Sequence, residues 1–393
     1  MNFGAALGRI AIMAALLLPV AGPQSPAEAG SGLDWRADVT PRPEGSRRRR
    51  PHRVMVDLPK PPFAIDRRLL PHDRGVRAYG EPYLGPIIDI ELHLATRGHR
   101  DTSLTELGEI VAGLRASGVE KALVMPTPNE GRRRRHEKRR LHRKLLAEIG
   151  GKAIGLMCCG HYVGQWLHQA YYDTYTEESL DRLLTRLAAD LDSGLYVGVG
   201  EIALYHFDKN GRQAIIRYPP NFEPFLKVVG LVASRGLWML LHAESVDPKG
   251  VSYEDQVFGG IELIYRRHPD LKLIVAHTAT TNPENLRRML ERYPNLMADF
   301  KLVKRVANWH HTEPVSNADR RLHEDWARLF EAMPRRFMVG TDSKFFRRRF
   351  DVAKYQRKIA RYRKVLGGLK PRVARLIAYE NAKRILSPGG DAK

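Results

Sequence analysis

The sequence predicts an α/β protein built as a (β/α)8 barrel, and three observations support this prediction. Short apolar, β-branched runs alternate with amphipathic stretches of helical length from about residue 86 onward. The runs are apolar without alternation, which is typical of strands buried on both faces of a parallel sheet. Eight such units within about 300 residues match the size of this barrel. A doubly wound open sheet is the competing architecture, although no G-x-G-x-x-G follows the first strand.

Each strand and the clearest helices can be placed from the pattern. The expected strands are 86–94, 119–126, 152–160, 195–204, 237–243, 271–277, 294–300 and 336–342. The clearest helical segments are 103–118, 179–194 and 282–294. Ser179 and Asn282 suit the start of their helices because short polar side chains accept hydrogen bonds from exposed backbone amides there. Gly118 is suited to end the first helix.

The chain divides into three parts before any fold is considered. Residues 1–29 are expected to be a signal peptide, because Arg9 precedes the apolar run 10–18 and an A-x-A cleavage pattern ends at Ala29. The mature protein would then be periplasmic or secreted and would keep no transmembrane segment. An uncleaved N-terminal anchor is the alternative.

The second part, 30–82, is a basic extension rich in Pro and Arg. Its PRPEGSRRRRP stretch is expected to be a flexible arm, and its later half to pack on the body. The third part, 83–390, is the expected barrel domain.

Positive charge is concentrated in three segments. The chain has 65 Lys+Arg and 44 Asp+Glu, a net charge of +21. Residues 30–82, 132–144 and 343–372 carry +5, +8 and +11, which leaves the remainder at −3. Such segments attract anionic partners, and an ordinary solvated surface is the equally weighted alternative. Five aromatic residues interleave with the last of them and favour an anionic substrate, surface or polyanion. No nucleic-acid-binding motif accompanies the charge.

The two cysteines, Cys158 and Cys159, are adjacent. Neighbouring residues rarely satisfy disulfide geometry, so we expect two buried apolar fillers of the third strand and no disulfide framework.

Imidazoles and carboxylates gather at the expected carboxyl ends of the strands, which meet at one mouth of a barrel. Alternate residues of a strand share a face, so Glu91 and His93 on the first strand point the same way. Three imidazoles and three carboxylates are a suitable ligand set for a divalent transition metal. The residues are Glu91 and His93 on the first strand, Glu201 on the fourth, His242 on the fifth, His277 on the sixth and Asp342 on the eighth.

Several short motifs, in order, resemble those of the amidohydrolase superfamily, especially its amidohydrolase-related (amidohydrolase 2-like) branch. They are IIDIELHL, LLHAE, LIVAHT, PNLMADF, VGTDS and YENAKRIL, and the resemblance covers roughly 86–388. VGEIAL (199–204) is also similar to a motif of TatD-type deoxyribonucleases.

The resemblance implies a role for each of these residues. Glu91, His93, His242 and His277 would be metal ligands, and Asp342 would be both a ligand and the general base. The TatD-like motif implies that Glu201 bridges to a second metal, with an ion pair as the alternative. One or two divalent ions are expected, with zinc the expected element.

The implied activity is hydrolysis of an amide, ester or phosphoester in a small, anionic molecule, with water activated by the metal. Glu91 stands where the family commonly has His, which keeps non-oxidative decarboxylation open. A non-catalytic envelope binding protein is a further alternative. Substrate contacts are considered for four residues after the strands, namely His161, Tyr205, His206 and Lys301.

Overall fold

A computed structural model describes most of the chain from Val54 to Leu386. The described residues are 54–68, 74–78, 80–94, 104–127, 143, 146–147, 153–207, 216–247, 249–302, 315–345 and 351–386. The predicted signal peptide, the PRPEGSRRRRP arm and nearly all of the basic segment 132–144 lie outside these residues. Within them, no helix is long and apolar enough to cross a membrane.

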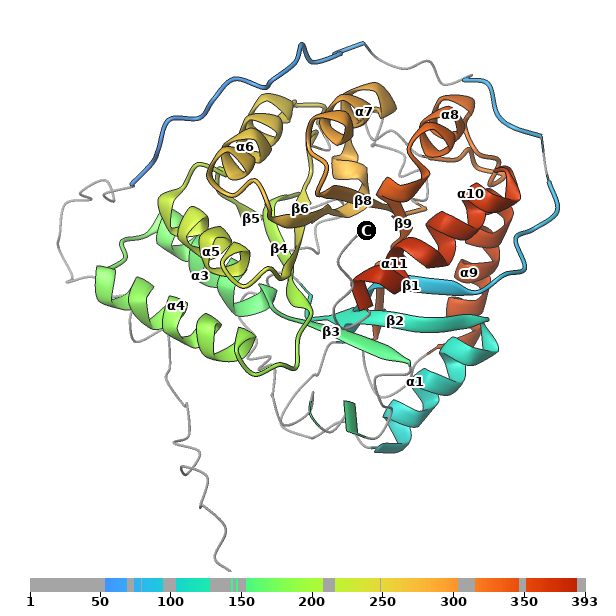
Figure 1. Cartoon of the computed structure of the whole chain (residues 1–393), viewed down its shortest axis with the longest axis horizontal. Coiled ribbons are helices and arrows are strands. Elements are labelled where there is room, and N and C mark those ends of the chain that lie inside the picture. Colours follow the sequence, from blue (N-terminus) through green and yellow to red (C-terminus); the bar gives the residue numbers. More distant parts are fainter. Residues whose placement is uncertain are drawn as a thin grey trace, which may run out of the picture.

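The predicted barrel is confirmed. Parallel strands follow one another around a curled sheet, with the sequence order preserved between neighbours (Figure 1). These strands are β1 Ile87–Leu94, β2 Val119–Met125, β3 Ile154–Cys159, β4 Gly198–His206, β6 Trp238–Ala243, β7 Lys272–Val275, β8 Leu296–Phe300 and β9 Phe337–Val339. A two-residue strand, β5 (Ile216–Arg217), pairs antiparallel with β4.

One stretch of chain closes the ring. Its first half, β9, pairs with β8, and its second half, β10 (Ser343–Phe345), pairs in parallel with β1. The predicted eighth strand, 336–342, is therefore correct at its start, whereas residues 340–342 form a break between two strand pairings. This break places Asp342 beside β1.

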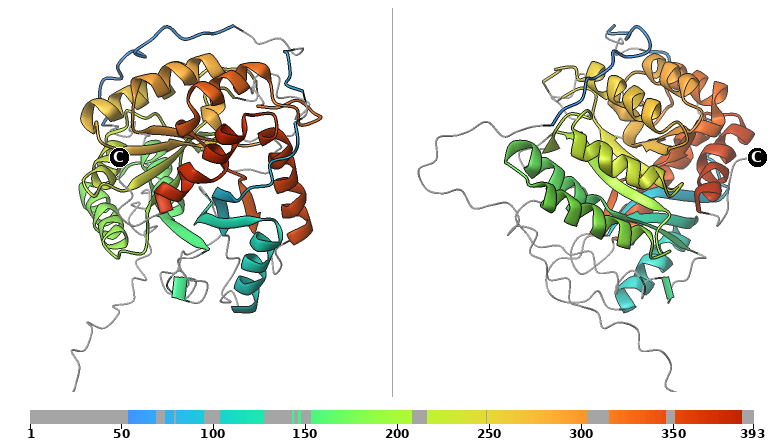
Figure 2. Two further views of the ribbon diagram at one scale, coloured as in Figure 1. Left: turned by 45° about the vertical axis from the view of Figure 1, so that its right-hand side comes forward. Right: turned by 60° about the vertical axis from the view of Figure 1, so that its left-hand side comes forward.

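Helices cover the outside of the barrel (Figures 1 and 2). They are α1 Leu104–Ala116, α3 Gly160–Tyr172, α4 Glu177–Leu191, α5 Glu223–Ala233, α6 Glu254–Arg267, α7 Pro283–Arg292, α8 Glu324–Ala332, α9 Val352–Leu366, α10 Pro371–Arg375 and α11 Asn381–Leu386. Shorter helical segments are η1 Ala276–Thr280, η2 Pro334–Arg336 and η3 Leu376–Glu380. Because helices cover the strands from outside, all five residues of β8 are buried, as the non-alternating apolar pattern predicts.

Two of the three predicted helix boundaries are confirmed. The Asn282 side chain accepts a hydrogen bond from the Asn285 amide at 2.9 Å and caps α7. Gly118 follows α1 with φ 67°, a left-handed conformation that favours glycine. Ser179 was wrong as a cap, because Thr176 is the N-cap of α4 and Ser179 is its partner in a capping box.

The later half of the basic extension packs on the barrel, as expected. Figure 1 shows it as the blue segment passing outside α6, α7 and α8. The Phe63 ring lies 5.5 Å from the Phe258 ring, centroid to centroid. Asp66 N–H donates to Asn285 Oδ1 at 2.7 Å. We call residues 54–78 the strap, of which 54–68 and 74–78 are described.

The expectation that the cysteines stay unpaired was wrong. Cys158 and Cys159 are joined by a disulfide bond within β3, and both are fully buried. Their burial was anticipated. Their bonding was not, since it requires an unusual local backbone, and Cys159 has φ 77° where the chain turns into α3.

Candidate metal centre

The structure brings together the six residues that the sequence singled out. Glu91 and His93 lie on β1, Glu201 on β4 and His242 on β6. Glu91 and His93 have no exposed surface, and Glu201, His242 and His277 are 2–7% exposed. Neighbouring parallel strands place their carboxyl ends on one side of the barrel, so residues from distant parts of the chain meet there.

His93 lies among three carboxylates. Its Nε2 is 3.1 Å from Asp342 Oδ1, 3.4 Å from Glu201 Oε2 and 3.5 Å from Glu91 Oε1. Its Nδ1 lies 3.3 Å from the carbonyl oxygen of Pro126, at the end of β2. The ring orientation is therefore set from the neighbouring strand, and Nε2 faces the acidic side chains.

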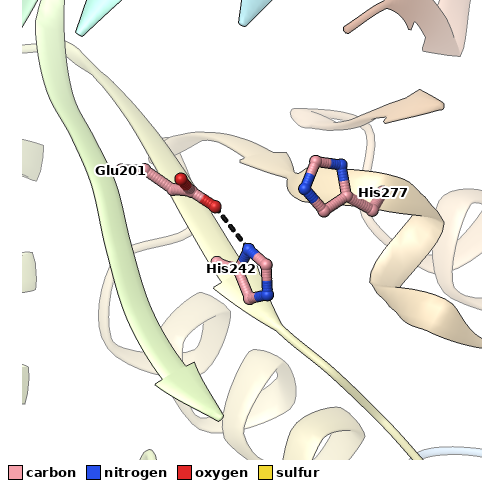
Figure 3. Close-up of side chains that lie close together, drawn as sticks. All are labelled: Glu201, His242 and His277. Carbon is pink, nitrogen blue, oxygen red and sulfur yellow. Dashed lines mark hydrogen bonds and ion pairs between the residues drawn. The ribbon is translucent and has the colours of Figure 1, made fainter. Parts of the chain in front are cut away.

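His242 lies between two carboxylates. Its Nδ1 is hydrogen-bonded to Glu201 Oε1, the pair joined by the dashed line in Figure 3, and its Nε2 lies 3.1 Å from Glu244 Oε1. The other oxygen of Glu244 accepts the Phe207 amide hydrogen at 2.9 Å. Glu244 therefore ties the imidazole to the backbone at the end of β4.

His277 lies beside two carboxylates, those of Glu91 and of Asp299 on β8. His277 Nδ1 lies 3.3 Å from Glu91 Oε2 and 3.4 Å from Asp299 Oδ1. Asp299 Oδ1 also accepts the His277 backbone amide hydrogen at 2.9 Å. Figure 3 shows the His277 ring directed toward the Glu201–His242 pair.

Two of the predicted residues lie in turns rather than in strands. The predicted sixth strand ends at Val275, and His277 lies in η1 with φ 54°. Asp342 lies in the break after β9 with φ 45°. Both therefore leave the regular pleat, and a left-handed conformation turns each toward the centre of the barrel. Strand periodicity alone does not describe this arrangement.

The buried carboxylates and imidazoles change one another's pKa values. Burial lowers the pKa of His242, but the charge of Glu201 outweighs it and raises the pKa to about 9. Burial likewise opposes protonation of His93, but the adjacent carboxylates of Asp342 and Glu91 raise its pKa to about 10. Burial raises the pKa of Glu201, yet His242 brings it down to about 2.

The remaining carboxylates divide into two kinds. Burial, followed by the charge of Glu201, raises the pKa of Glu91 to about 7. Burial and the charge of Glu91 raise the pKa of Asp299 well above its usual range. Burial also acts to raise the pKa of Asp342, but the Lys301 ammonium outweighs this effect and lowers the pKa well below its usual range. The pKa values of Glu91 and Asp299 are therefore raised, whereas those of Glu201 and Asp342 are lowered.

The donor set fits a divalent cation. Three overlapping groups have ligand atoms within 4.8 Å of one another, and these are Glu91–His93–Glu201, Glu201–His242–His277 and Glu91–His277–Asp299. Among the described residues, neither buried oxygen of Glu91 meets hydrogen-bond geometry with any partner. A buried carboxylate without hydrogen bonds is costly, and a bound cation would remove that cost. Imidazole and carboxylate are ligands that zinc and similar ions accept.

Lys301 and Lys344 approach the outer side of this cluster. The Lys301 ammonium donates a hydrogen bond to Asp342 Oδ2. Lys344 Nζ lies 3.5 Å from Asp342 Oδ1. Asp342 thus faces His93 on one side and two ammonium groups on the other.

Sequence reasoning missed Glu244 and Asp299. Glu244 lies two residues after His242, and Asp299 two residues before Lys301. Residues two apart in a strand share a face, so each acid could have been found from a neighbour that was already a candidate. Both were overlooked because a single acidic residue in an otherwise apolar strand motif does not by itself indicate a functional site.

The other candidate residues are placed as follows. Lys301 contacts Asp342, as described above. The ring of His206, the last residue of β4, lies 5.0 Å from the His242 ring, centroid to centroid. Tyr205 is buried and packs against Tyr253 at 5.0 Å. His161 is half-buried in the first turn of α3.

Two aromatic residues of the basic segment 343–364 lie in the core rather than on a binding surface. Tyr355 and Tyr362 on α9 are buried. Tyr355 donates to Asp89 Oδ2 at 2.8 Å, and Tyr362 donates to the Gly340 carbonyl at 2.7 Å. The sequence interpretation of these two tyrosines was wrong, because the spacing of the apolar face of α9 places them in the core.

Comparison with known proteins identifies the family. The sequence model of the family described as amidohydrolase matches residues 174–387, more than half of the chain. No curated protein sequence matches.

Solved structures of similar fold have low identity to this chain. An uncharacterised TIM-barrel protein from Bordetella bronchiseptica is 13% identical with a TM-score of 0.48, covering 77% of this chain and 98% of that one. The 4-oxalomesaconate hydratase of Rhodopseudomonas palustris is 11% identical with a TM-score of 0.44, covering 76% and 95%. The dihydroorotase of Campylobacter jejuni is 15% identical with a TM-score of 0.39, covering 80% and 86%.

The family match spans α4 to α11 and includes Glu201, His242, His277 and Asp342. The remaining two residues of the predicted ligand set, Glu91 and His93, lie before it and reach the same cluster from β1. Sequence and geometry thus agree, and the chain belongs to the amidohydrolase family of metal-dependent hydrolases.

Proposed function

We propose that this protein is an exported hydrolase that holds one or two divalent ions, zinc being the expected element, and cleaves an amide, ester or phosphoester bond of an anionic small molecule. The observation that carries the proposal is the convergence of buried donor groups around Glu91. Its two oxygens face different histidines, His93 and His277, and meet no hydrogen-bond geometry among the described residues.

Two adjoining sets of residues would hold the ions. Glu91, His93, Glu201 and Asp342 surround one position, and Glu201, His242 and His277 surround the other. Glu201 belongs to both sets, which supports the bridging role suggested by the sequence. A divalent cation supplies Lewis acidity and lowers the pKa of a water molecule bound to it.

Asp342 is the proposed general base. Its low pKa keeps it ionised at neutral pH, so that it can accept a proton from the attacking water. The hydrogen bond from Lys301 to Oδ2 holds the carboxylate while Oδ1 faces His93. Asp342 would then pass the proton to the leaving group.

Non-oxidative decarboxylation on the same fold is the second candidate, and Glu91 favours it. A carboxylate in place of an imidazole adds negative charge to the ligand set and weakens the Lewis acidity of a bound ion. The two reactions differ in their products, because hydrolysis consumes water and decarboxylation releases carbon dioxide.

Metal content tests the proposal. The mature protein is purified without chelator or His-tag, alongside His242→Ala and Asp342→Ala, and its metal is measured per chain. We expect one or two equivalents in the wild type and a clear loss in both variants. A wild type that binds no zinc, manganese or iron after reconstitution would overturn the metal-dependent mechanism.

Export is tested separately. N-terminal sequencing of the protein from the culture medium and the periplasm should begin at Gly30. An intact Met1 on protein that stays inside the cell would contradict export and leave the chemistry of the metal centre untouched.

A further inference from the structure

Lys301 lies at the carboxyl end of a barrel strand. It directly follows β8 and lies two residues after Asp299, so the strand period places both side chains on the same face. The Lys301 side chain is 22% exposed. An ammonium group that is mostly withdrawn from water needs partners that compensate its charge.

Asp342 is the one hydrogen-bond acceptor of Lys301 among the described residues. A lysine ammonium has three N–H groups, so two of them remain to be satisfied. Asp342 must at the same time face His93 at 3.1 Å. Within the described part of the chain, Lys301 is therefore only partly satisfied.

Lys344, on β10, also lies close to the Asp342 carboxylate. Its Nζ lies 3.5 Å from Asp342 Oδ1, its side chain is 31% exposed, and it forms no other ion pair among the described residues. A third ammonium, that of Lys358 on α9, donates to Ser343 Oγ at 3.2 Å and to the Thr341 carbonyl. Three positive charges thus surround the turn that carries a single carboxylate.

The other acidic residues of the centre pair with histidines rather than with lysines. Glu91, Glu201 and Asp299 form their ion pairs with histidines, and none of these three forms one with a lysine in the described part of the chain. Among these carboxylates, Asp342 is therefore the one that pairs with the lysines in the described part of the chain.

We propose that Lys301 and Lys344 bind an anionic group of the substrate, a carboxylate or a phosphate, next to the bond that is cleaved. This inference rests on the proposed function. It makes Lys301 a specificity-determining residue, because its ammonium group lies against Asp342, the proposed general base. Substrates without such an anion would leave the two ammonium groups to share the single carboxylate of Asp342.

Binding to the metal-loaded protein tests the proposal, with inorganic phosphate, succinate and neutral succinamide as probes in calorimetry. We expect phosphate or succinate to bind at least about tenfold more tightly than succinamide, since a charged hydrogen bond contributes about that factor. The anion that binds more tightly shows whether the substrate carries a phosphate or a carboxylate. A wild type that binds neither anion better than succinamide overturns the proposal.

Variants separate anion binding from a purely structural role. Lys301→Met should weaken anion binding about tenfold with unchanged metal content, and Lys301→Arg should retain most of it. The matched control is Lys227→Met, which removes an exposed lysine paired with Glu177 and should change nothing. Unchanged anion affinity in Lys301→Met overturns the proposal.

Lys344→Met is a second test, needed if Lys301→Met displaces Asp342 and the protein loses its metal. It removes the more exposed ammonium and leaves the Lys301–Asp342 hydrogen bond in place. Weaker anion binding with full metal content supports the proposal, and unchanged binding overturns it. Metal content is measured in the same samples. A wild type without metal therefore counts against the proposed function, and a metal-loaded wild type that ignores anions counts only against this inference.

Discussion

Glu91 connects the two halves of the centre. One oxygen faces His93 on its own strand, and the other faces His277, which follows β7 on a distant part of the barrel. An imidazole at this position would present one ligand atom to one ion, whereas a carboxylate presents two. Glu91 therefore couples the two ligand groups, at the cost of extra negative charge.

Glu244 is expected to position His242 for metal binding. It fixes Nε2 at 3.1 Å and is itself held by the Phe207 amide, so Nδ1 stays directed toward Glu201. Glu244→Ala should weaken zinc affinity about 10- to 100-fold, measured by competition with a chelator. The control is Glu262→Gln, a buried glutamate bonded to Tyr293, and it should leave zinc affinity unchanged. Equal losses in both variants would indicate a general loss of stability.

Gly340 leaves room for Asp299. A Cβ at this position would lie 2.7 Å from Asp299 Cγ, closer than packed atoms allow. Gly340→Ala should therefore displace the carboxylate that holds His277, lower the free energy of unfolding by about 1–3 kcal/mol and weaken zinc binding.

Gly164→Ala is the matched control, because a Cβ there meets no atom within 4 Å and the residue lies in α3. It should be neutral or stabilising by up to about 1 kcal/mol, as alanine is the better helix former. Denaturant unfolding measures both variants. A Gly340→Ala protein with wild-type stability and zinc affinity would show that Asp299 has room to adjust.

At the scale of elements, the break between β9 and β10 builds much of the centre. Asp89 of β1 accepts the Thr341 amide hydrogen at 2.9 Å and the Thr341 hydroxyl at 2.6 Å. These bonds hold the turn against β1, and Asp342 follows immediately. The same turn that closes the barrel thereby sets the position of the proposed general base.

The strap is fixed to α8 by Arg77. Its guanidinium forms ion pairs with Glu324 at 2.7 Å and with Glu331 at 2.9 Å. The side chains of Arg77 and Glu331 are 25% and 15% exposed. Arg77→Met should lower the free energy of unfolding at pH 7 by about 1–3 kcal/mol, because charged hydrogen bonds are lost at a mostly buried position.

This effect should depend on pH. Arg77 lowers the pKa of Glu331 below its ordinary value of 4.5, so the stabilisation is complete above that value. It is lost as the pH falls through the lower pKa of the folded state. The difference between wild type and Arg77→Met should therefore shrink below about pH 4.5, measured by urea unfolding at several pH values. Arg328→Met is the control, because Arg328 is an exposed residue of α8 and its removal should leave the stability unchanged at every pH. A difference that stays constant down to pH 3 would contradict the assigned ion pair.

At the scale of the whole molecule, the centre joins strands from all around the barrel. The candidate ligands come from β1, β4 and β6 and from the turns after β7 and β9. A cation bound there would hold these strands together and would bind only the folded chain. Ligand binding of this kind stabilises by about 2.7 kcal/mol when the free ion exceeds its dissociation constant a hundredfold.

Removal of metal should therefore lower the thermal midpoint of the whole barrel, and added zinc should restore it. Scanning calorimetry before and after chelation measures this change. His242→Ala should show a smaller response to zinc than the wild type. A thermal midpoint that does not move when the metal is removed would argue against a cation shared by these strands.

The sequence alone determined the barrel and the identity of most candidate ligands. Apolar runs without alternation can be satisfied only by strands covered on both faces, and polar residues at their ends then have only the barrel mouth to occupy. This reasoning led to all six residues, Glu91, His93, Glu201, His242, His277 and Asp342, without coordinates. The family came from a separate resemblance of several short motifs.

Only the tertiary structure decided how these residues meet. Asp299 and Glu244 were hidden within apolar strands, and His277 and Asp342 depend on left-handed turns that periodicity does not encode. The disulfide within β3 and the burial of Tyr355 were likewise decided by local backbone and packing. The physical reason is that a sequence pattern fixes which face of an element is apolar, whereas distances between side chains of different strands arise only when the ring closes.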